Sequence, residues 1–236
     1  YMEKSDMKVL ITGVAGVVGS KLEKVLLERG HDVFGIDLMH TDKVYGHGLG
    51  KVKDNYFRCD IGEYRQIKDV IEYVQPDIVY NCAAEFGRWN GENFYEQVWR
   101  TNVVGLKHII RLQEKLKFKL VHFSSSEVYG DYEDVMYEDV IDNVAIDQMN
   151  DYAITKWAGE LMCLNSTTMF GSEIVRVRPL NCYGPYEHYT PYRGFIPKFI
   201  YHALNKKPYT VFKGHKRIID YVEDSCRTFA NISEIF

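Results

Sequence analysis

Short apolar runs alternate with amphipathic segments along most of this chain. The runs are rich in β-branched residues, whereas the segments between them carry apolar residues at helical spacing, as Leu22, Val25 and Leu26 do. We expect strands at 9–11, 32–36, 56–59, 78–81, 119–124 and 173–178. The helices expected with them span 21–29, 63–74, 93–116 and 150–165. This alternation predicts an α/β fold, a doubly wound parallel sheet covered on both faces.

The pattern changes after residue 180. Tyrosines and prolines crowd 183–193, and a helix at 194–205, a strand-like run at 209–212 and a helix at 221–235 follow. We therefore divide the chain into a main domain, 7–180, and a smaller lobe, 181–236, whose last segment returns to the main domain. The lobe is expected over the carboxyl edge of the sheet, where ligands bind in such folds. The glycine-rich stretch 41–55 is expected to be a long loop.

Three glycines spaced by three follow the first expected strand and lead into a helix. Gly13 allows a sharp turn, Gly16 lets the backbone approach a pyrophosphate, and Gly19 lets the helix pack closely on the strand. The N–H groups of that helix would face the phosphates. Strand, glycine turn and helix together predict a Rossmann-type dinucleotide site, although a tight turn alone would also need glycines.

The second expected strand ends in Asp37, which lies 24 residues beyond Gly13. This is close to the spacing at which an acidic side chain binds the adenosine ribose hydroxyls. A carboxylate there repels a 2′-phosphate, so Asp37 favours NAD over NADP. The alternative is an ordinary turn aspartate at a strand end.

Composition and charge narrow the class of protein. With 236 residues, 46% of them hydrophobic, the chain can bury a sizeable core. A net charge of −4 with scattered basic residues argues against a nucleic-acid or membrane partner. The five cysteines are expected to be reduced thiols in a cytoplasmic protein, and no residue cluster suggests a metal.

Tyr152 and Lys156 lie four residues apart on an expected helix and share one of its faces. A nearby ammonium and an oxidised nicotinamide would favour the phenolate and turn the tyrosine into a base. The same spacing occurs at Tyr64 and Lys68, so spacing alone selects nothing. Tyr152 is distinguished because it follows the serine run 124–126, which ends the fifth strand at the carboxyl edge of the sheet. The alternatives are a solvated helix face and a capping role for the serines.

Several further motifs occur together and in order. They are Thr12-Gly13-x-x-Gly16-x-x-Gly19, Asp60-Ile61, Ala83-Ala84, Asn102, Ser124 to Gly130, Tyr152-x-x-x-Lys156, Arg178 to Pro185 and Arg217 to Asp224. With them the chain resembles the extended short-chain dehydrogenase/reductases, specifically the NAD-dependent nucleotide-sugar epimerase/dehydratase family. The resemblance implies a tightly held NAD, a transient 4-keto sugar, a nucleoside-diphosphate sugar substrate and an NAD-binding domain at 7–180. It also implies a substrate-binding role for the lobe, which is expected to be only partly contained in this chain.

Site residues follow from the resemblance position by position. The catalytic serine, base and lysine fall on Ser125, Tyr152 and Lys156. The cofactor positions are Gly13, Ala15, Gly16, Val17, Val18, Asp37, Asp60, Ile61, Ala83, Ala84, Asn102, Ser124, Tyr152 and Lys156. The substrate positions are Glu85, Ser126, Asn181 and Arg217, and the Arg217 guanidinium also suits phosphate because its planar fork binds oxygens in pairs. One departure is Asn81, where many members carry histidine.

Glu127 bears on the reaction. Family members that eliminate water or carbon dioxide after C4 oxidation resemble this chain in carrying glutamate there, because a 4-ketone acidifies the C5 proton for a carboxylate base. One dehydratase class has an acid where this chain has Ser126, so dehydratase and decarboxylase both stay open. We favour a 4,6-dehydratase or decarboxylase type lyase. A nucleotide-sugar 4-epimerase is the alternative, and a cofactor-exchanging reductase and a non-catalytic NAD sensor are less favoured.

The resemblance also implies a homodimer that pairs the helices expected at 93–116 and 150–165. Apolar residues on these helices would either form that interface or face the sheet. They are Val98, Val103, Leu106, Trp157, Leu161 and Met162.

Overall fold

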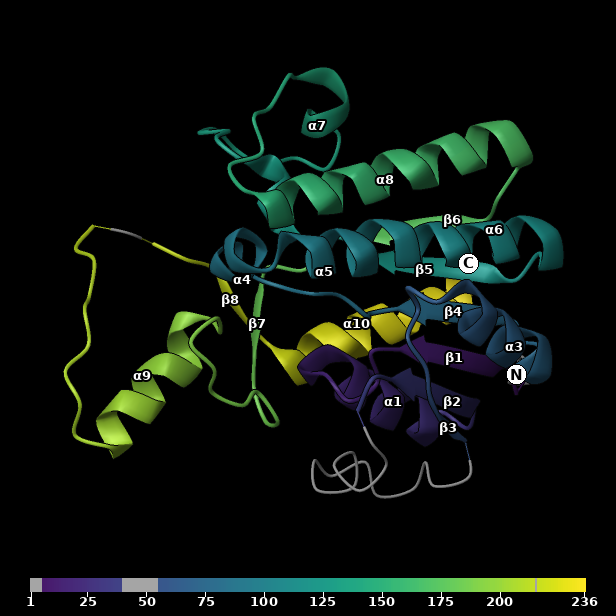
Figure 1. Ribbon diagram of the computed structural model, residues 1–236, viewed down its shortest axis with the longest axis horizontal. Helices are drawn as coiled ribbons and strands as arrows, with labels where there is room; N and C mark the ends of the chain where they lie inside the picture. Colours follow the sequence, from purple (N-terminus) through teal and green to yellow (C-terminus); the bar gives the residue numbers. More distant parts are fainter. Residues whose placement is uncertain (1–5, 40–54, 215) are drawn as a thin grey trace.

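The structure, a computed structural model, describes residues 6–39, 55–214 and 216–236. A six-stranded sheet forms its centre, in the order β3-β2-β1-β4-β5-β6, with every neighbouring pair parallel (Figure 1). The strands are β1 (Lys8–Thr12), β2 (Asp32–Asp37), β3 (Tyr56–Arg58), β4 (Ile78–Asn81), β5 (Lys119–Phe123) and β6 (Ile174–Val177). The predicted doubly wound parallel sheet is confirmed, and the strand order reverses at β1.

The strand register brings the carboxyl ends of the central strands together. Thr12 pairs with Ile36 on one side and with Asn81 on the other, and Asn81 pairs with His122. The segments that follow β1, β2, β4 and β5 therefore begin at one edge of the sheet. Both chain termini lie at the opposite end (Figure 1).

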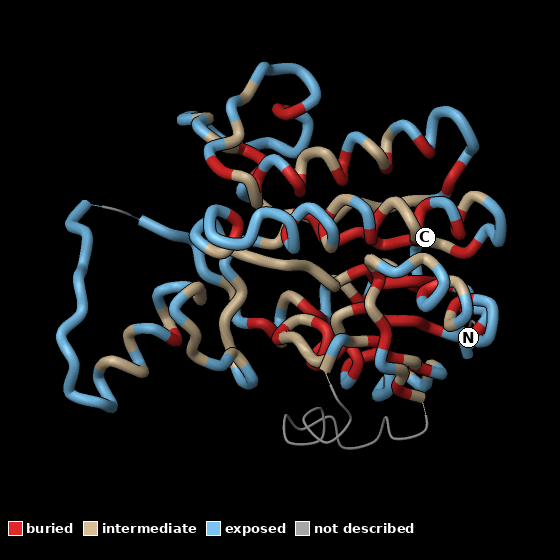
Figure 2. Tube along the Cα trace, viewed as in Figure 1, coloured by how far each residue is buried: buried red, intermediate tan, exposed pale blue. Residues whose placement is uncertain are grey.

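Helices cover both faces of the sheet, so the main domain has three layers. Helices α1 (Val17–Glu28) and α10 (Val222–Ile235) pack on one face, with Leu22, Leu26 and Cys226 fully buried against it. Helices α3 (Tyr64–Val74), α6 (Leu106–Leu116) and α8 (Asp151–Phe170) cover the other, where Ile67 and Ile109 are fully buried. Buried residues accordingly follow the strands and the inner sides of these helices (Figure 2).

The single helix predicted at 93–116 is wrong in detail. The structure instead has α4 (Arg88–Asn93), α5 (Tyr95–Trp99), a π-helical turn η1 (Arg100–Gly105) and α6. Gly105 permits a close approach here, because a Cβ on it would lie 2.7 Å from the Ile61 side chain. The π-turn inserts an extra residue per turn and so redirects the side chains of residues 100–102.

Residues after 180 build a small two-stranded parallel sheet that was not predicted, β7 (Asn181–Tyr183) with β8 (Ile219–Tyr221), and helix α9 (Phe195–Leu204). The strand expected at 209–212 is wrong, since those residues form no strand. Helix α10 then returns to pack along α1, whereas β7, β8 and α9 stand beyond the carboxyl ends of the main sheet (Figure 1). Two short elements, the 3-10 turn η2 (Ser126–Tyr129) and α7 (Val140–Asn143), follow β5.

The structure also bears on the cysteines and on the loop expected at 41–55. The five cysteines are free thiols, as predicted, and Cys59, Cys163 and Cys226 are buried. Most of the loop expected at 41–55 lies outside the described residues. Within the described parts of the chain, no helix has the length and hydropathy to cross a bilayer, and no group of three or more His, Cys, Asp or Glu residues is arranged to hold a metal ion.

Candidate active site

The glycine turn after β1 is built by close backbone contacts. Gly13 has a φ of 69°, and a Cβ on it would lie 2.7 Å from the Ala83 backbone. A Cβ on Gly19 would lie only 2.2 Å from the Gly13 carbonyl oxygen, so α1 begins directly against the turn. Gly16 precedes α1 and has no side chain with which to cap it, which leaves the N–H groups of the first turn available to an anion.

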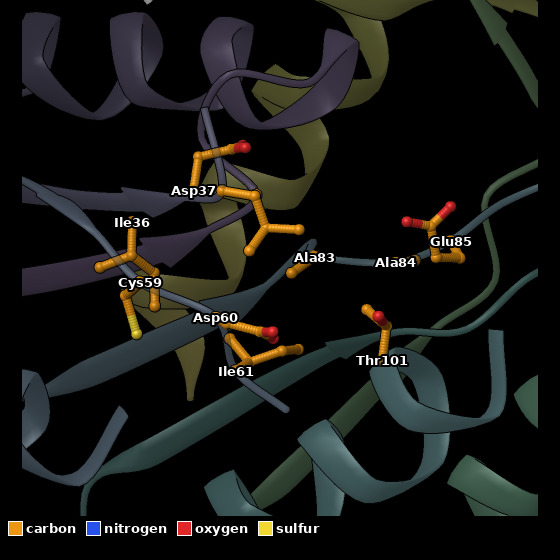
Figure 3. A pocket seen from close by; sticks show the side chains of 11 residues that line it. Ile36, Asp37, Cys59, Asp60, Ile61, Ala83, Ala84, Glu85 and Thr101 are labelled. Atoms are coloured by element: carbon orange, nitrogen blue, oxygen red, sulfur yellow. The ribbon is translucent and has the colours of Figure 1, made fainter. Parts of the chain in front are cut away.

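Asp37 lies at the end of β2 beside this turn. Its carboxylate accepts a hydrogen bond from the Ala15 backbone N–H at 3.0 Å and another from the Met39 N–H at 3.2 Å. Asp37 also lines a pocket at the carboxyl edge of the sheet (Figure 3). The pocket is lined by Gly13, Ile36, Asp37, Leu38, Cys59, Asp60, Ile61, Ala83, Ala84, Glu85 and Thr101. The carboxylate needed for ribose hydroxyls is thus beside the glycine turn that would approach a pyrophosphate.

Figure 3 shows Asp60 and Ile61 on the side of the pocket away from Asp37, and Ala83 lies between Asp37 and these two residues. Asp60 is already engaged: its Oδ1 accepts from the Gly62 N–H at 2.8 Å, and its Oδ2 is 3.0 Å from the Arg100 guanidinium. Ala83 and Ala84 leave β4 as small residues, which leaves room for a flat ligand over the strand end. These residues fit the adenosine half of NAD.

Asn102 is buried and joins the pocket to helix α8. Its side chain accepts from the Glu85 N–H and donates to the Glu85 carbonyl, both at 2.9 Å, and also donates to the Thr155 hydroxyl at 3.1 Å. Every polar atom of the amide is therefore used within the protein. Asn102 therefore holds the segment after β4 against α8, and its expected contact with NAD stays a prediction.

Val17 and Ser124, two other expected cofactor positions, have side chains directed into the protein. Val17 is buried in the core, and Val18 packs against it. The Ser124 hydroxyl donates to the buried Glu160 carboxylate at 2.5 Å. Gly16, another expected cofactor position, is half-buried at the start of α1 and is therefore more accessible than Val17 and Ser124.

Ser125, Glu127 and Tyr152 come together from three elements: the end of β5, η2 and the first turn of α8. Asn150 caps α8 by accepting from the Ala153 N–H at 2.9 Å, which fixes the start of the helix. The Ser125 hydroxyl accepts from the Glu127 N–H at 3.2 Å and lies close enough to Tyr152 to lower the pKa of its phenol, whereas the charge of Glu127 raises that pKa. Glu127 is exposed, and its carboxylate accepts from the Asn150 amide at 3.4 Å.

Lys156 lies one turn further along α8, with its ammonium buried. The Nζ donates to the Phe123 carbonyl at 2.8 Å and is 5.8 Å from the centre of the Tyr152 ring. Burial lowers the pKa of Lys156 from its usual 10.5 to about 8. The Lys156 ammonium thus binds the end of β5 and lies next to the face of the Tyr152 ring.

The protein surroundings of Tyr152 shift the pKa of its phenol. Burial raises it to about 12, the Ser125 hydrogen bond opposes this rise, and the Glu127 charge adds to it. The Lys156 ammonium beside the ring and the positive charge of an oxidised nicotinamide would both act against this rise and favour the phenolate.

The four expected substrate residues are spread over the crevice. Glu85 follows the two alanines and accepts from the Asn90 amide at 3.0 Å, and Ser126 begins η2. The Asn181 amide donates to the Ile218 carbonyl at 2.8 Å, so it braces β7 against the segment that leads into β8. Arg217 is exposed in that same segment. The substrate-binding role expected of Arg217 stays a prediction.

Sequence analysis missed several residues of this region. Ile36, Leu38, Cys59 and Thr101 each adjoin a predicted residue in sequence and could have been found by extending the motifs by one position. Glu160 lies four residues after Lys156 on α8, so the helical repeat that pairs Tyr152 with Lys156 already pointed to it.

The buried ammonium predicts a stability effect with a definite sign. Because the pKa of Lys156 is lower in the folded state, the unfolded chain holds this proton more tightly, and the free energy of unfolding rises with pH above about pH 8. We expect Lys156 to contribute a rise of about 2 kcal/mol between about pH 8 and pH 10. Denaturant unfolding of wild type and Lys156→Met measures it as the difference between their pH profiles. Parallel profiles would contradict the burial of a charged lysine.

Comparison with known proteins is consistent with this site. Residues 9–234 match the NAD dependent epimerase/dehydratase family. The UDP-N-acetyl-alpha-D-glucosaminuronate decarboxylase of Bacillus cytotoxicus is 31% identical over 223 residues, which cover 92% of this chain and 68% of that protein. The dTDP-glucose 4,6-dehydratase of Salmonella typhimurium is 27% identical over 251 residues, covering 94% of this chain and 67% of that protein.

Among solved structures, the UDP-glucuronic acid 4-epimerase from Bacillus cereus, in complex with UDP-glucuronic acid and NAD, matches with a TM-score of 0.83. It is 27% identical, and the match covers 97% of this chain and 73% of that one. The chain spans roughly two thirds of the length of these relatives. The sequence resemblance is confirmed: this chain is an NAD-dependent enzyme of the extended short-chain dehydrogenase/reductase type and belongs to the NAD-dependent epimerase/dehydratase family.

Proposed function

We propose that this enzyme is a nucleotide-sugar lyase. It oxidises its sugar at C4 and then releases either the C6 hydroxyl as water or the C6 carboxylate as carbon dioxide. The observation that carries the proposal is the place of Glu127, an exposed carboxylate close enough to Tyr152 for its charge to raise the pKa of the phenol. A second proton-transferring group thus lies beside the oxidation centre. Epimerisation at C4 alone has no need of one.

The first step uses Ser125, Tyr152 and Lys156. NAD, when bound, accepts the hydride from C4 and later returns it. The Ser125 hydroxyl hydrogen-bonds to Tyr152 and is placed to pass the proton of the sugar O4 hydroxyl to it. The Lys156 ammonium below the ring stabilises the tyrosine in its deprotonated state.

The second step uses Glu127 where C6 carries a hydroxyl. Glu127 takes the C5 proton, a C5–C6 double bond forms, and the C6 oxygen leaves with a proton as water; the hydride taken from C4 then returns to C6, and C5 takes up a proton. For a C6 carboxylate, the C5–C6 bond breaks without a base, carbon dioxide leaves, and the electron pair enters the enolate of the 4-ketone; C5 is then protonated and the hydride returns to C4. Ser126 is compatible with both. The similarity to a decarboxylase and to a 4,6-dehydratase supports the class without selecting the member.

A 4-epimerase is the second candidate. The structural similarity to the UDP-glucuronic acid 4-epimerase favours it, because the same Ser-Tyr-Lys site can return the hydride to the opposite face of C4. In that case Glu127 would be a surface carboxylate of η2.

Glu127→Gln separates the two candidates. The amide cannot accept the C5 proton, so we expect product formation to fall about 100-fold while the reduced nicotinamide signal of the first step still appears. Stopped-flow absorbance and product analysis measure the two steps. Glu133→Gln is the matched control, because Glu133 is an exposed glutamate on the loop after η2. Equal turnover by wild type and Glu127→Gln would contradict the dehydratase step, and the mass of the product then separates the epimerase from the decarboxylase.

We also propose a homodimer. Of the six residues named for the interface, Val98 and Leu106 are fully buried within the subunit, whereas Leu161 is 48% exposed on α8. Ile154 on the same helix and Trp99 on α5 are also exposed, which leaves an apolar surface on this pair of helices. Light scattering measures the assembly.

A further inference from the structure

Behind the catalytic residues, the Glu160 carboxylate of α8 is completely buried between two arginines of the segment at and after β6. Its Oε2 is 3.0 Å from the Arg176 guanidinium, and Arg178 binds both oxygens, at 2.8 Å through Nε and 2.7 Å through Nη2. Glu160 also accepts from the Ser124 hydroxyl. A carboxylate with no exposure needs such partners, since an unpaired buried charge costs several kcal/mol.

Arg178 has a second set of partners on its far side. Its Nη1 donates to the Tyr129 hydroxyl at 2.8 Å and to the Glu138 carbonyl at 2.7 Å. Tyr129 is the last residue of η2, the turn that carries Glu127. One guanidinium therefore connects the helix of Tyr152 and Lys156 to the turn of Glu127.

Longer hydrogen bonds and packing hold the rest of η2. The Ser126 N–H donates to the Pro179 carbonyl at 3.1 Å, the Gln148 amide donates to the Val128 carbonyl at 3.0 Å, and the Val128 side chain is completely buried. The Asn150 amide at the start of α8 donates to the Glu127 carboxylate at 3.4 Å. Charge-assisted hydrogen bonds at short distances, such as those of Arg178, are roughly twice as strong as neutral ones. Among the described residues, Arg178 thus joins η2 to α8 through the shortest charge-assisted bonds.

We propose that Arg178 is a positioning residue, which acts through the Tyr129 hydroxyl to hold Glu127 in register with Tyr152. This inference rests on the proposed function, because it assigns Arg178 to the step that Glu127 carries. The guanidinium itself does not touch substrate or cofactor in this role. Its partners Glu160 and Tyr129 are both buried, so the tie is shielded from solvent.

Tyr129→Phe tests the proposal with the smallest change, because it removes one hydroxyl and keeps the ring and the Arg178–Glu160 pair. We expect product formation to slow about tenfold, with the first step, read as reduced nicotinamide, unchanged within about twofold. Tyr132→Phe is the matched control: this tyrosine packs on the same apolar cluster, and its hydroxyl is not bound by Arg178. Arg178→Lys, which loses the bidentate fork, should act in the same direction and more strongly.

A double-mutant cycle with Glu127→Gln distinguishes positioning from general destabilisation. If Tyr129 acts through Glu127, Tyr129→Phe should have no further effect, within about twofold, in the Glu127→Gln background. An equal slowing in both backgrounds, an equal slowing of both steps, or no slowing in wild type would each overturn the proposal. Failure of the proposed function gives a different result: the wild type alone would then release a product of unchanged mass.

Discussion

Replacing Tyr152 by phenylalanine should lower turnover about 1000-fold while leaving NAD bound. The substitution removes only the hydroxyl that hydrogen-bonds to Ser125, and the ring keeps its place above Lys156. Without that hydroxyl, no group in the described site can take the sugar O4 proton through Ser125. Steady-state turnover with the nucleotide-sugar substrate and the NAD content of the purified variant measure the two effects.

Tyr64→Phe is the matched control for this prediction. Tyr64 also precedes a lysine by four residues on a helix, but it lies at the start of α3, and its ring contacts that of His108. We expect the control to keep full activity. Turnover by Tyr152→Phe within about tenfold of wild type would contradict the assignment of the base.

The second large effect is expected at Gly19. The Cβ of alanine there would overlap the Gly13 carbonyl oxygen at 2.2 Å and lie 2.8 Å from the Val14 Cα, and neither backbone atom can turn aside. The start of α1 must therefore shift away from the glycine turn. We expect Gly19→Ala to lose about 3 kcal/mol of unfolding free energy and to weaken NAD binding at least tenfold.

Gly194→Ala is the control, because a Cβ on Gly194 meets nothing within 4 Å. Its unfolding free energy should stay within about 0.5 kcal/mol of wild type. Denaturant unfolding and calorimetric titration with NAD measure both variants. A Gly19→Ala protein with wild-type stability and NAD affinity would show that the helix does not need this close approach.

Local chemistry explains what the sequence predicted well. The β-branched runs, the glycine spacing and the acidic residue at the end of β2 each act within a few residues, so the sheet and the pocket beside Asp37 followed from them. Asn150 at the start of α8 is another local signal, and the structure shows it as the helix cap.

Longer-range effects account for the misses. An unbroken helical periodicity at 93–116 cannot reveal the π-turn at η1, where Gly105 closely approaches the Ile61 side chain. The run 209–212 has strand-like residues but no neighbouring strand to pair with, whereas β7 and β8 pair across a wide gap in sequence. The effect of burial on the pKa of Tyr152 likewise depends on the folded chain and not on sequence spacing.

The Glu160 cluster shows the same limit. Arg176 and Arg178 come from the segment at and after β6, and they meet Glu160 only because α8 crosses that strand. In the sequence, each of these three residues looks like a surface charge. The complete burial of Glu160, and so its role in joining α8 to the segment at and after β6, is seen only in the structure.

The most direct measurement is the reaction itself. The protein with NAD is incubated in deuterated water with UDP-, dTDP-, GDP- and CDP-linked sugars, including the uronic acids, and the products are identified by mass spectrometry and proton NMR. We predict a product that has lost water or carbon dioxide and carries solvent deuterium at C5 or C6. A product of unchanged mass, inverted at C4 and free of deuterium, would contradict the lyase and establish a 4-epimerase.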